Sequence, residues 1–502
     1  LAGAYAGALA KARRDVVRRV DALLVDDRDR LQAARAANAE AERLRAEALR
    51  IFDAGARGRG EEAWAQARKR GAAAGREFAE ASRAFEAAIA QDPTRADVRA
   101  LLGQTLYERA LLAEAAGDAD QAAELAQRFA LYDADGDLAR RWDAPALVSL
   151  AGAPPGARVA LEGGPGGPAR ELGQTPLGPT ELALGSFVLV LSAPGRATVR
   201  YPLLAGRGER LELAVDLPAA TDLPAGFVYV PPGRFLFGSA DDEEVRRGYF
   251  DTVPRHEVRT DGYLIGRTEV TYGAWLDYLE ALEPAERARR LPRAEAKIGQ
   301  SGGLRLERRG GLWWLTITPS ERTYGARAGE RLVYSGRKER DRQDWLELPV
   351  TGLSSEDFAA YAAWLDRTGR VPGARLCTEY EWERAARGAD GRPFPHGEGL
   401  TGAEANYGDT YGPEGKGPDE VGSYPASQSP FGLEDTSGNV WELVRSSLDG
   451  GQFVARGGSY LHDRKTAQLT NRTVVSPALR DTSVGGRLCA TFPRPPEPPE
   501  GG

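Results

Sequence analysis

The chain has 502 residues, a formal net charge of −7 and 42% hydrophobic residues. This length predicts two to four domains, and this hydrophobic content is typical of globular folding and excludes a wholly disordered chain. Charges of both signs are interspersed, which argues against nucleic acid as a partner, and no apolar run reaches the roughly 20 residues that cross a bilayer.

Residues 1–143 are rich in alanine, arginine, glutamate and leucine, which predicts helices. Residues 21–52 are expected to form one long helix that ends before the glycine-rich stretch 55–60. Small residues and an Asp-Pro step within residues 84–110 resemble a tetratricopeptide-type helix pair. We therefore expect all-α helical hairpins here, with tetratricopeptide-like units as the more specific interpretation.

Residues 144–218 change to clustered proline and glycine with short β-rich runs between turns. The runs are residues 158–161, 186–192, 198–204 and 211–215. They predict a small all-β sandwich. Segments 156–159, 175–177 and 193–195 resemble the PEGA domain, which implies a spacer module without catalytic groups.

Residues 226–492 contain an ordered series of short motifs. The motifs lie at residues 227–238, 268–271, 349–354, 375–388 and 438–442. Their order and spacing resemble the formylglycine-generating enzyme (sulfatase-modifying factor) family. The resemblance implies an α+β domain with a C-type-lectin-like fold, interrupted by an insertion at about residues 280–345. The Pro/Glu/Gly-rich tail 493–502 is expected to be disordered.

Within this domain, residues 375–388 predict a helix that Thr378 caps, with Glu381 completing a capping box. Trp382 is expected to face the core, and Cys377 to pack beside the helix as a small apolar residue. The two cysteines of the chain do not make a disulfide framework, which favours a cytoplasmic location. An anchor outside this chain remains an open alternative.

Oxygen-bearing residues gather in a tight, glycine-containing loop at residues 435–442, and such oxygens are the ligands that Ca²⁺ prefers. The family resemblance implies a structural calcium held by Asp435, Gly438, Asn439, Val440 and Glu442. It also implies a second calcium site that begins at Asn406 and Tyr407 and closes on Asp409 or Asp419. The alternative is a loop held by carboxylate-to-amide hydrogen bonds without metal.

The last segment of the domain opens with the run Arg-Gly-Gly-Ser-Tyr at residues 456–460. Enzymes of the family carry two copper-binding cysteines just after this run, and this chain has His462 and Ala467 at those positions. Soft thiolates suit copper(I), whereas one imidazole opposite a methyl group cannot make a two-sulfur site. The replacements argue against copper and predict a pseudoenzyme whose fold is kept for binding.

The surface around the last segment is therefore the candidate binding site, for a protein or a small-molecule ligand. The candidate contacts are Trp441, Ser459, Tyr460, His462, Asp463, Arg464 and Asn471. The same fold also serves as the variable display domain of proteins diversified by retroelements, a role that the polar run 462–472 suits.

The competing hypothesis is a metal-dependent oxidoreductase of the formylglycine-generating or non-haem iron type with a rearranged site. An iron site would need two of the three histidines, His256, His396 and His462, to converge with a carboxylate such as Asp463.

The order of the modules resembles the C-terminal regions of large bacterial serine/threonine kinases. None of the kinase signature motifs occurs in this chain, so the resemblance implies a kinase or signalling domain upstream and a sensory or regulatory role. The chain as a whole is thus predicted to be multidomain.

Overall fold

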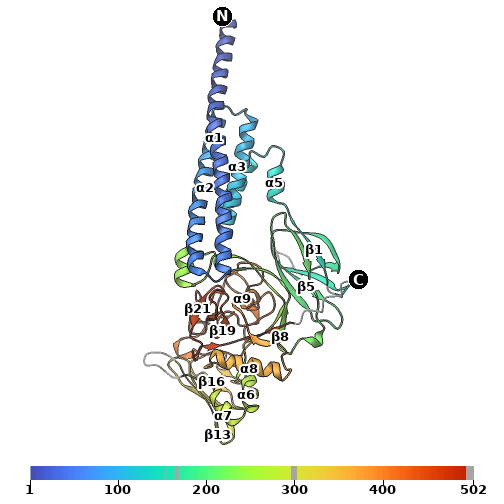
Figure 1. Ribbon diagram of the computed structural model, residues 1–502, viewed down its shortest axis with the longest axis vertical. Coiled ribbons are helices and arrows are strands. Elements are labelled where there is room, and N and C mark those ends of the chain that lie inside the picture. The colour runs from blue at the N-terminus through green and yellow to red at the C-terminus, as the bar shows by residue number, and fades with distance from the viewer. Residues whose placement is uncertain (1, 153, 164–168, 295–301, 493–502) are drawn as a thin grey trace. The chain divides into compact units, whose positions relative to one another are not determined.

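The computed structural model describes residues 2–152, 154–163, 169–294 and 302–492 (Figure 1). The chain divides into two compact units. One unit consists of Leu1–Ala146 with Arg207–Glu209, and the other of Leu147–Gly206 with Arg210–Gly502. The β-rich region predicted as a separate domain therefore belongs to the same unit as the C-terminal domain. The predicted disorder of the tail falls on residues outside the described ranges.

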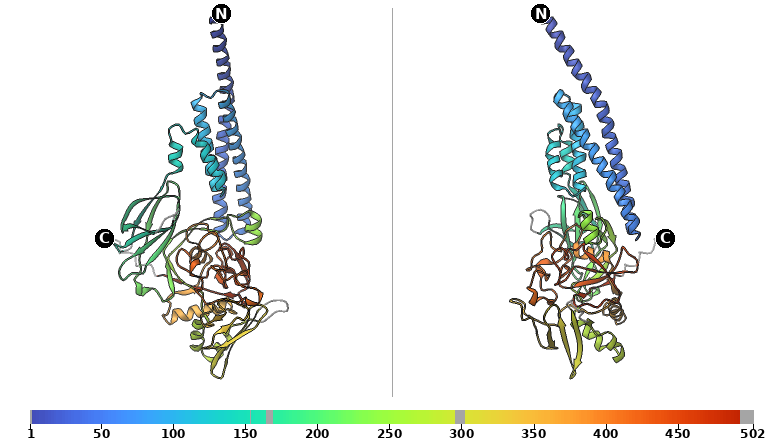
Figure 2. Two further views of the ribbon diagram at one scale, coloured as in Figure 1. Left: turned by 180° about the vertical axis from the view of Figure 1, so that it is seen from behind. Right: turned by 90° about the vertical axis from the view of Figure 1, so that its left-hand side faces the viewer.

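The first unit consists of helices, two of them long (Figure 2). They are α1 (Ala2–Asp53), α2 (Arg57–Gln91), α3 (Ala96–Ala115), α4 (Ala119–Ala130) and α5 (Asp137–Trp142). Each of the first four packs against the next in sequence. Asp92 ends α2 beside Pro93, and the Asp118 side chain caps α4 by accepting from the backbone N–H of Gln121 at 2.9 Å. The predicted helical region is confirmed, and its identity as tetratricopeptide-like hairpins stays a prediction.

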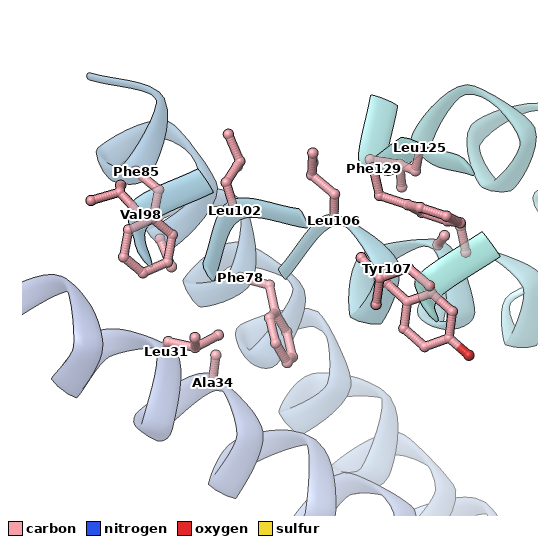
Figure 3. Packing of buried hydrophobic residues seen from close by; sticks show 14 of the residues in the cluster. Leu31, Ala34, Phe78, Phe85, Val98, Leu102, Leu106, Tyr107, Leu125 and Phe129 are labelled. Carbon is pink, nitrogen blue, oxygen red and sulfur yellow. The ribbon is translucent and has the colours of Figure 1, made fainter. Parts of the chain in front are cut away.

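The core of the helical unit joins residues from all five helices of this unit, four of which carry the residues labelled in Figure 3. Leu31 of α1, Phe78 and Phe85 of α2, Leu102 of α3 and Phe129 of α4 are all buried. Fully buried alanines between them let the helix backbones approach closely, as the small residues of the sequence predict.

Phe85→Ala is expected to destabilise the helical unit by about 3–5 kcal/mol, because it removes a fully buried ring and leaves a cavity. Urea unfolding of the whole chain, followed by far-ultraviolet circular dichroism, measures the loss. The matched control is Val25→Ala on the exposed face of α1, which should change stability by less than about 0.5 kcal/mol. Equal effects of the two variants would contradict the packing described here.

The β-rich part of the second unit forms two sheets. One has the order β3 (Arg170–Gln174), β2 (Arg158–Gly163), β5 (Gly185–Ser192) and β6 (Val199–Ala205), and the other β4 (Leu177–Leu182), β1 (Ala146–Ala151) and β7 (Arg210–Ala214). Along β5, Phe187, Leu189 and Leu191 alternate with partly exposed residues, which is the period of a strand with one buried face. All four predicted β runs are strands, and the PEGA assignment stays a prediction.

The C-terminal domain is α+β, as predicted. Its central sheet has the order β18 (Ala374–Leu376), β23 (Leu488–Thr491), β11 (Tyr263–Gly266) and β8 (Phe227–Val230). Beside it lie the hairpin of β9 (Gly233–Phe237) and β10 (His256–Thr260), a π-helical turn η2 (Glu244–Tyr249), and the helices α6 (Tyr272–Glu280), α8 (Ser355–Arg367) and α9 (Glu379–Arg387). Short 3₁₀ turns are η1 (Ala220–Asp222), η3 (Pro413–Gly415) and η4 (Pro425–Ser427).

The predicted insertion has its own elements. They are α7 (Pro284–Arg289), the strands β12 (Arg293–Ala294), β13 (Gly303–Arg309), β14 (Leu312–Thr318) and β15 (Tyr324–Arg327) of one sheet, and the pair β16 (Leu332–Val333) and β17 (Arg342–Gln343). Its last part contacts the loop at residues 411–424. Tyr324 donates to the Glu414 carbonyl at 2.6 Å and Arg331 pairs with Glu420 at 3.0 Å. The insertion is therefore attached to the domain by specific polar contacts.

Helix α9 begins where the sequence predicts. Thr378 and Glu381 form the capping box, with the Glu381 carboxylate accepting from the Thr378 backbone N–H at 2.8 Å. Trp382 and the two alanines at 385–386 lie in the main core of the domain.

The prediction for the cysteines is wrong. Cys377, directly after β18, forms a disulfide with Cys489 of β23. The two strands are neighbours in the central sheet, with Leu376 opposite Leu488, so the backbone brings the sulfurs together across 112 residues of sequence. Because disulfides persist mainly in oxidising compartments, the cysteine argument for a cytoplasmic location no longer holds. Within the described ranges, no helix combines the length and the apolar character that crossing a membrane requires.

Candidate functional site: the pocket beside His462

Residues 441–485 form a further four-stranded sheet in the C-terminal domain. Its order is β21 (Arg472–Val475), β20 (Phe453–Arg456), β19 (Trp441–Arg445) and β22 (Val484–Gly485), with β19 and β22 parallel. Beside it lies a pocket of about 400 Å³. The pocket is lined by Tyr249, Trp441, Ala455, His462, Thr466, Asn471, Thr473, Val475, Asp481, Ser483 and Val484.

His462 is held in a defined orientation at this pocket. Its Nδ1 accepts from the Trp441 indole N–H at 3.2 Å and lies 2.8 Å from the Ser459 hydroxyl. Burial lowers the pKa of the imidazole, so the ring is neutral at pH 7. An indole N–H can only donate, which places the ring proton on Nε2. His462 thus presents a neutral ring whose Nδ1 is already engaged.

Ala467, at the other predicted cysteine position, is fully buried among apolar residues. It belongs to a cluster with Phe394, Leu400, Ala405 and Tyr407. Gly458 lies directly against it: a Cβ at Gly458, whose φ is +75°, would be 2.9 Å from the Ala467 Cα. The donor set for copper is therefore one imidazole opposite packed methyl and aromatic groups, which does not fit a two-thiolate site.

The other predicted contacts divide into two groups. Trp441 and Asn471 line the pocket with His462. Tyr460 is buried and donates to the Thr482 carbonyl at 3.2 Å, so it supports the wall of the pocket and does not face a ligand.

Asp463 and Arg464 also have structural partners. The Asp463 carboxylate accepts from the backbone N–H and the hydroxyl of Thr466, both at 2.8 Å. Arg464 donates to the Glu398 carbonyl at 3.2 Å. Whether any of these residues contacts a ligand stays a prediction.

Eight pocket residues are not among the predicted contacts: Tyr249, Ala455, Thr466, Thr473, Val475, Asp481, Ser483 and Val484. Tyr249 lies 217 positions before Thr466 in the sequence, and its hydroxyl lies 2.6 Å from that of Thr466. Thr473 and its neighbour Val474 on β21 are both exposed, so no alternation along this strand indicates Thr473.

The predicted first calcium site fits only in part. Arg487 donates to both oxygens of Glu442 at 2.8 Å, and the Trp382 indole also donates to Oε2 at 2.8 Å. Both Glu442 oxygens thus accept hydrogen bonds from the Arg487 guanidinium, so this carboxylate does not fit the role of a metal ligand. Gly438 and Val440 lie nearby, and a Cβ at Gly438 would be 2.4 Å from the Asn406 carbonyl oxygen.

Asp435 and Glu269 form a buried acidic pair beside Asn439. Burial raises the pKa of Asp435 to about 7, and burial together with the Asp435 charge raises that of Glu269 well above its ordinary value. Asn439 donates to Glu269 Oε1 at 3.1 Å, while Glu269 Oε2 accepts no hydrogen bond from any residue in the described ranges. The Arg487 guanidinium also faces this pair, with its NH2 3.9 Å from Glu269 Oε2. Sequence reasoning missed Glu269.

The histidines have separate partners. His256 Nδ1 lies 2.7 Å from the Pro254 carbonyl, and His396 Nε2 lies 3.2 Å from Glu404. Within residues 2–152, 154–163, 169–294 and 302–492, no three His, Cys, Asp or Glu side chains gather in an arrangement that could hold a metal ion.

Residues 215–492 match the Sulfatase-modifying factor enzyme 1-like domain. The chain belongs to this family, with a helical region preceding the family domain.

Among curated proteins, the chain is 33% identical over 202 residues to the inactive C-alpha-formylglycine-generating enzyme 2 of Bos taurus, covering 37% of this chain and 61% of the relative. It is 30% identical over 265 residues to the hercynine oxygenase of Mycobacterium tuberculosis, covering 47% and 54%. The chain thus spans between half and two thirds of these relatives. Among solved structures, PvdO from Pseudomonas aeruginosa is 25% identical with a TM-score of 0.37, covering 54% of this chain and 96% of PvdO.

Proposed function

We propose that this chain is a non-catalytic binding region that uses the pocket beside His462 to hold a protein segment or a small molecule. The observation that carries the proposal is the pair His462 and Ala467. One residue is a neutral imidazole already hydrogen-bonded by Trp441, and the other is buried in apolar packing. The relative from Bos taurus whose name includes "inactive" supports the same reading.

The pocket suits a ligand that has hydrogen-bonding groups and a flat or aliphatic face that can pack against aromatic rings. Trp441 and Tyr249 offer aromatic surface, and Asn471, Ser483 and Asp481 offer hydrogen-bonding groups. Such a mixture of a few polar groups and aromatic walls is typical of specific small-ligand and peptide sites. The polar run 462–472 borders the pocket, which is compatible with a diversified display surface.

The alternative function is an oxidoreductase, and the similarity to a hercynine oxygenase favours it. In that case His462 would be one ligand of a redox metal. The side chains around it supply no second sulfur or imidazole in the described part of the chain, so the binding function is the better supported of the two.

Metal loading separates the two functions. The purified chain is loaded anaerobically with copper(I) or iron(II), desalted and analysed for metal content. We expect no stoichiometric redox metal in the natural chain. The positive control is the double variant His462→Cys/Ala467→Cys, which restores the two thiolates and is expected to retain copper. One equivalent of metal in the natural chain that is lost in His462→Ala would contradict the proposal.

One wider proposal rests on the order of the modules. The helical region and the β-rich region would act as spacers or partner surfaces in a larger signalling protein, with a kinase or other signalling domain upstream. Separately, we propose a structural calcium at the predicted residue Asp435, with Glu269 as a ligand that the sequence did not indicate. Calcium would neutralise the two carboxylates and fix the loop that carries Asn439.

A further inference from the structure

The insertion places a buried arginine in the loop where the second calcium site is predicted. The Arg337 side chain and the Asp419 carboxylate are both fully buried, and the guanidinium NH1 donates to Asp419 Oδ1. Asp409, the alternative acid, is exposed. Asp419 is therefore the acid of this predicted site, and the cation that pairs with its carboxylate is the Arg337 guanidinium.

Four of the five N–H groups of the guanidinium donate to oxygen acceptors, one of them to Asp419. Its Nε donates to the Gly415 carbonyl at 2.7 Å, NH2 to the Gly417 carbonyl at 2.6 Å, and NH1 also to the Arg340 carbonyl at 3.3 Å. Backbone carbonyls and one carboxylate are the ligand types that calcium takes in proteins. The loop thus offers its oxygens to a planar organic cation in place of a metal.

Aromatic rings pack against the two faces of the Arg337 guanidinium. The guanidinium carbon lies 3.8 Å from the ring centroid of Tyr334 and 3.9 Å from that of Tyr411, which gives two cation–π contacts. The hydroxyls of Tyr411 and Tyr424 donate to Asp419 Oδ2 at 3.0 and 2.6 Å. Both carboxylate oxygens are therefore satisfied, and the buried charge pair has the additional hydrogen bonds that it needs.

Two glycines, Gly336 and Gly417, lie where the insertion contacts the loop. A Cβ at Gly336 would be 2.7 Å from the Glu414 carbonyl carbon, and one at Gly417, whose φ is +158°, would be 2.6 Å from the Tyr334 ring. Glycine at these two positions lets the guanidinium reach the loop carbonyls.

Hydrogen bonds connect this loop to the backbone of residues at the pocket. Asn406 donates from Nδ2 to the Gly417 carbonyl at 2.8 Å, and its own carbonyl accepts from the Asn439 backbone N–H at 2.7 Å. Two residues further on, the Gly408 N–H donates to the His462 carbonyl at 2.6 Å. The backbone of His462 is thus tied to the loop that Arg337 fixes.

We propose that the Arg337 guanidinium substitutes for the metal ion at the Asn406–Asp419 loop, which makes this side of the pocket independent of calcium. Arg337 is a positioning residue that acts through the loop and does not contact a ligand. The inference is independent of what the pocket binds.

Calcium binding to matched variants tests this substitution. Equilibrium dialysis with millimolar calcium is expected to give one more bound calcium per chain for Arg337→Ala than for the natural chain. The double variant Arg337→Ala/Asp419→Asn should lose this extra calcium. Arg342→Ala, whose side chain is 72% exposed in the same insertion, should match the natural chain. Equal calcium binding by Arg337→Ala and the natural chain would overturn the proposal.

A measurement on the natural chain decides the question if Arg337→Ala does not fold. Amide hydrogen exchange of residues 406–419 is compared in calcium and in a chelator. The substitution predicts the same protection of this loop in both conditions. Loss of protection on chelation, confined to this loop, would show that a metal holds it and would overturn the proposal.

Discussion

Arg456→Ala should lower the free energy of unfolding of the C-terminal domain by about 3–5 kcal/mol, because it removes one of the two guanidinium partners of each of the buried carboxylates Glu379 and Glu383. Arg456 is fully buried and donates to Glu379 at 2.5 Å, to the Leu469 carbonyl at 2.5 Å, and to Glu383. These bonds attach the last segment to helix α9.

The same cluster holds β21 in place. Arg472 donates from Nε to Glu379 at 2.8 Å, and from NH2 to Asp449 at 2.9 Å. Burial alone would raise the pKa of Glu379, but Arg472 and Arg456 hold it below its ordinary value. This contribution to stability is present above the unfolded pKa and is lost as the pH falls through the folded one.

Urea unfolding of the natural chain and of Arg456→Ala measures the effect, with intrinsic tryptophan fluorescence as the signal. Arg445→Ala is the matched control, since Arg445 is an exposed arginine of β19, the strand that pairs with that of Arg456. A loss below about 1 kcal/mol, the range of exposed ion pairs, would mean that this cluster does not fix the last segment.

The second large effect is a pH dependence of the acidic pair Asp435 and Glu269. Because the pKa of Asp435 is raised to about 7, the folded chain binds more protons than the unfolded chain between about pH 4 and pH 7. Stability should therefore fall as the pH rises through this window when no metal is present. For Asp435 alone the loss is up to about 4 kcal/mol.

Asp435→Asn should remove this part of the pH dependence, because the amide carries no charge at any pH in the window. Thermal unfolding in a chelator at several pH values measures it, with the exposed Asp409→Asn as control. Added calcium at pH 8 should raise the melting temperature of the natural chain more than that of Asp435→Asn. Parallel pH profiles for the natural chain and Asp435→Asn would contradict the assignment.

Local signals in the sequence predicted much of the fold. The capping box at Thr378 and the alternation along residues 186–192 depend on neighbours in the chain, and both are present in the structure. The replacement of the cysteine pair by His462 and Ala467 could also be deduced, because a motif fixes their positions. The structure adds the reason that Ala467 offers no ligand: it is buried in an apolar cluster.

Several interactions that the sequence did not predict join residues far apart in the chain. Cys377 and Cys489 meet because β18 and β23 are neighbours, and Arg337 reaches Asp419 across 82 positions. Arg456 and Glu379 are separated by 77 positions. No periodicity or spacing marks such pairs, since the folded backbone alone decides which buried charges face each other. Sequence reasoning did not indicate Arg487, the guanidinium partner of Glu442 on another segment, for the same reason, and calcium at this loop stays a prediction.

Oxygen consumption by the natural chain tests the central claim, that the pocket beside His462 binds without oxidising. The chain is preloaded with copper(I) or iron(II) and mixed with a cysteine-containing peptide in an oxygen electrode cell. The double variant His462→Cys/Ala467→Cys serves as the reference for a restored metal site. We expect no oxygen uptake above the metal-only background for the natural chain. Sustained uptake that depends on the peptide and disappears in His462→Ala would contradict the claim.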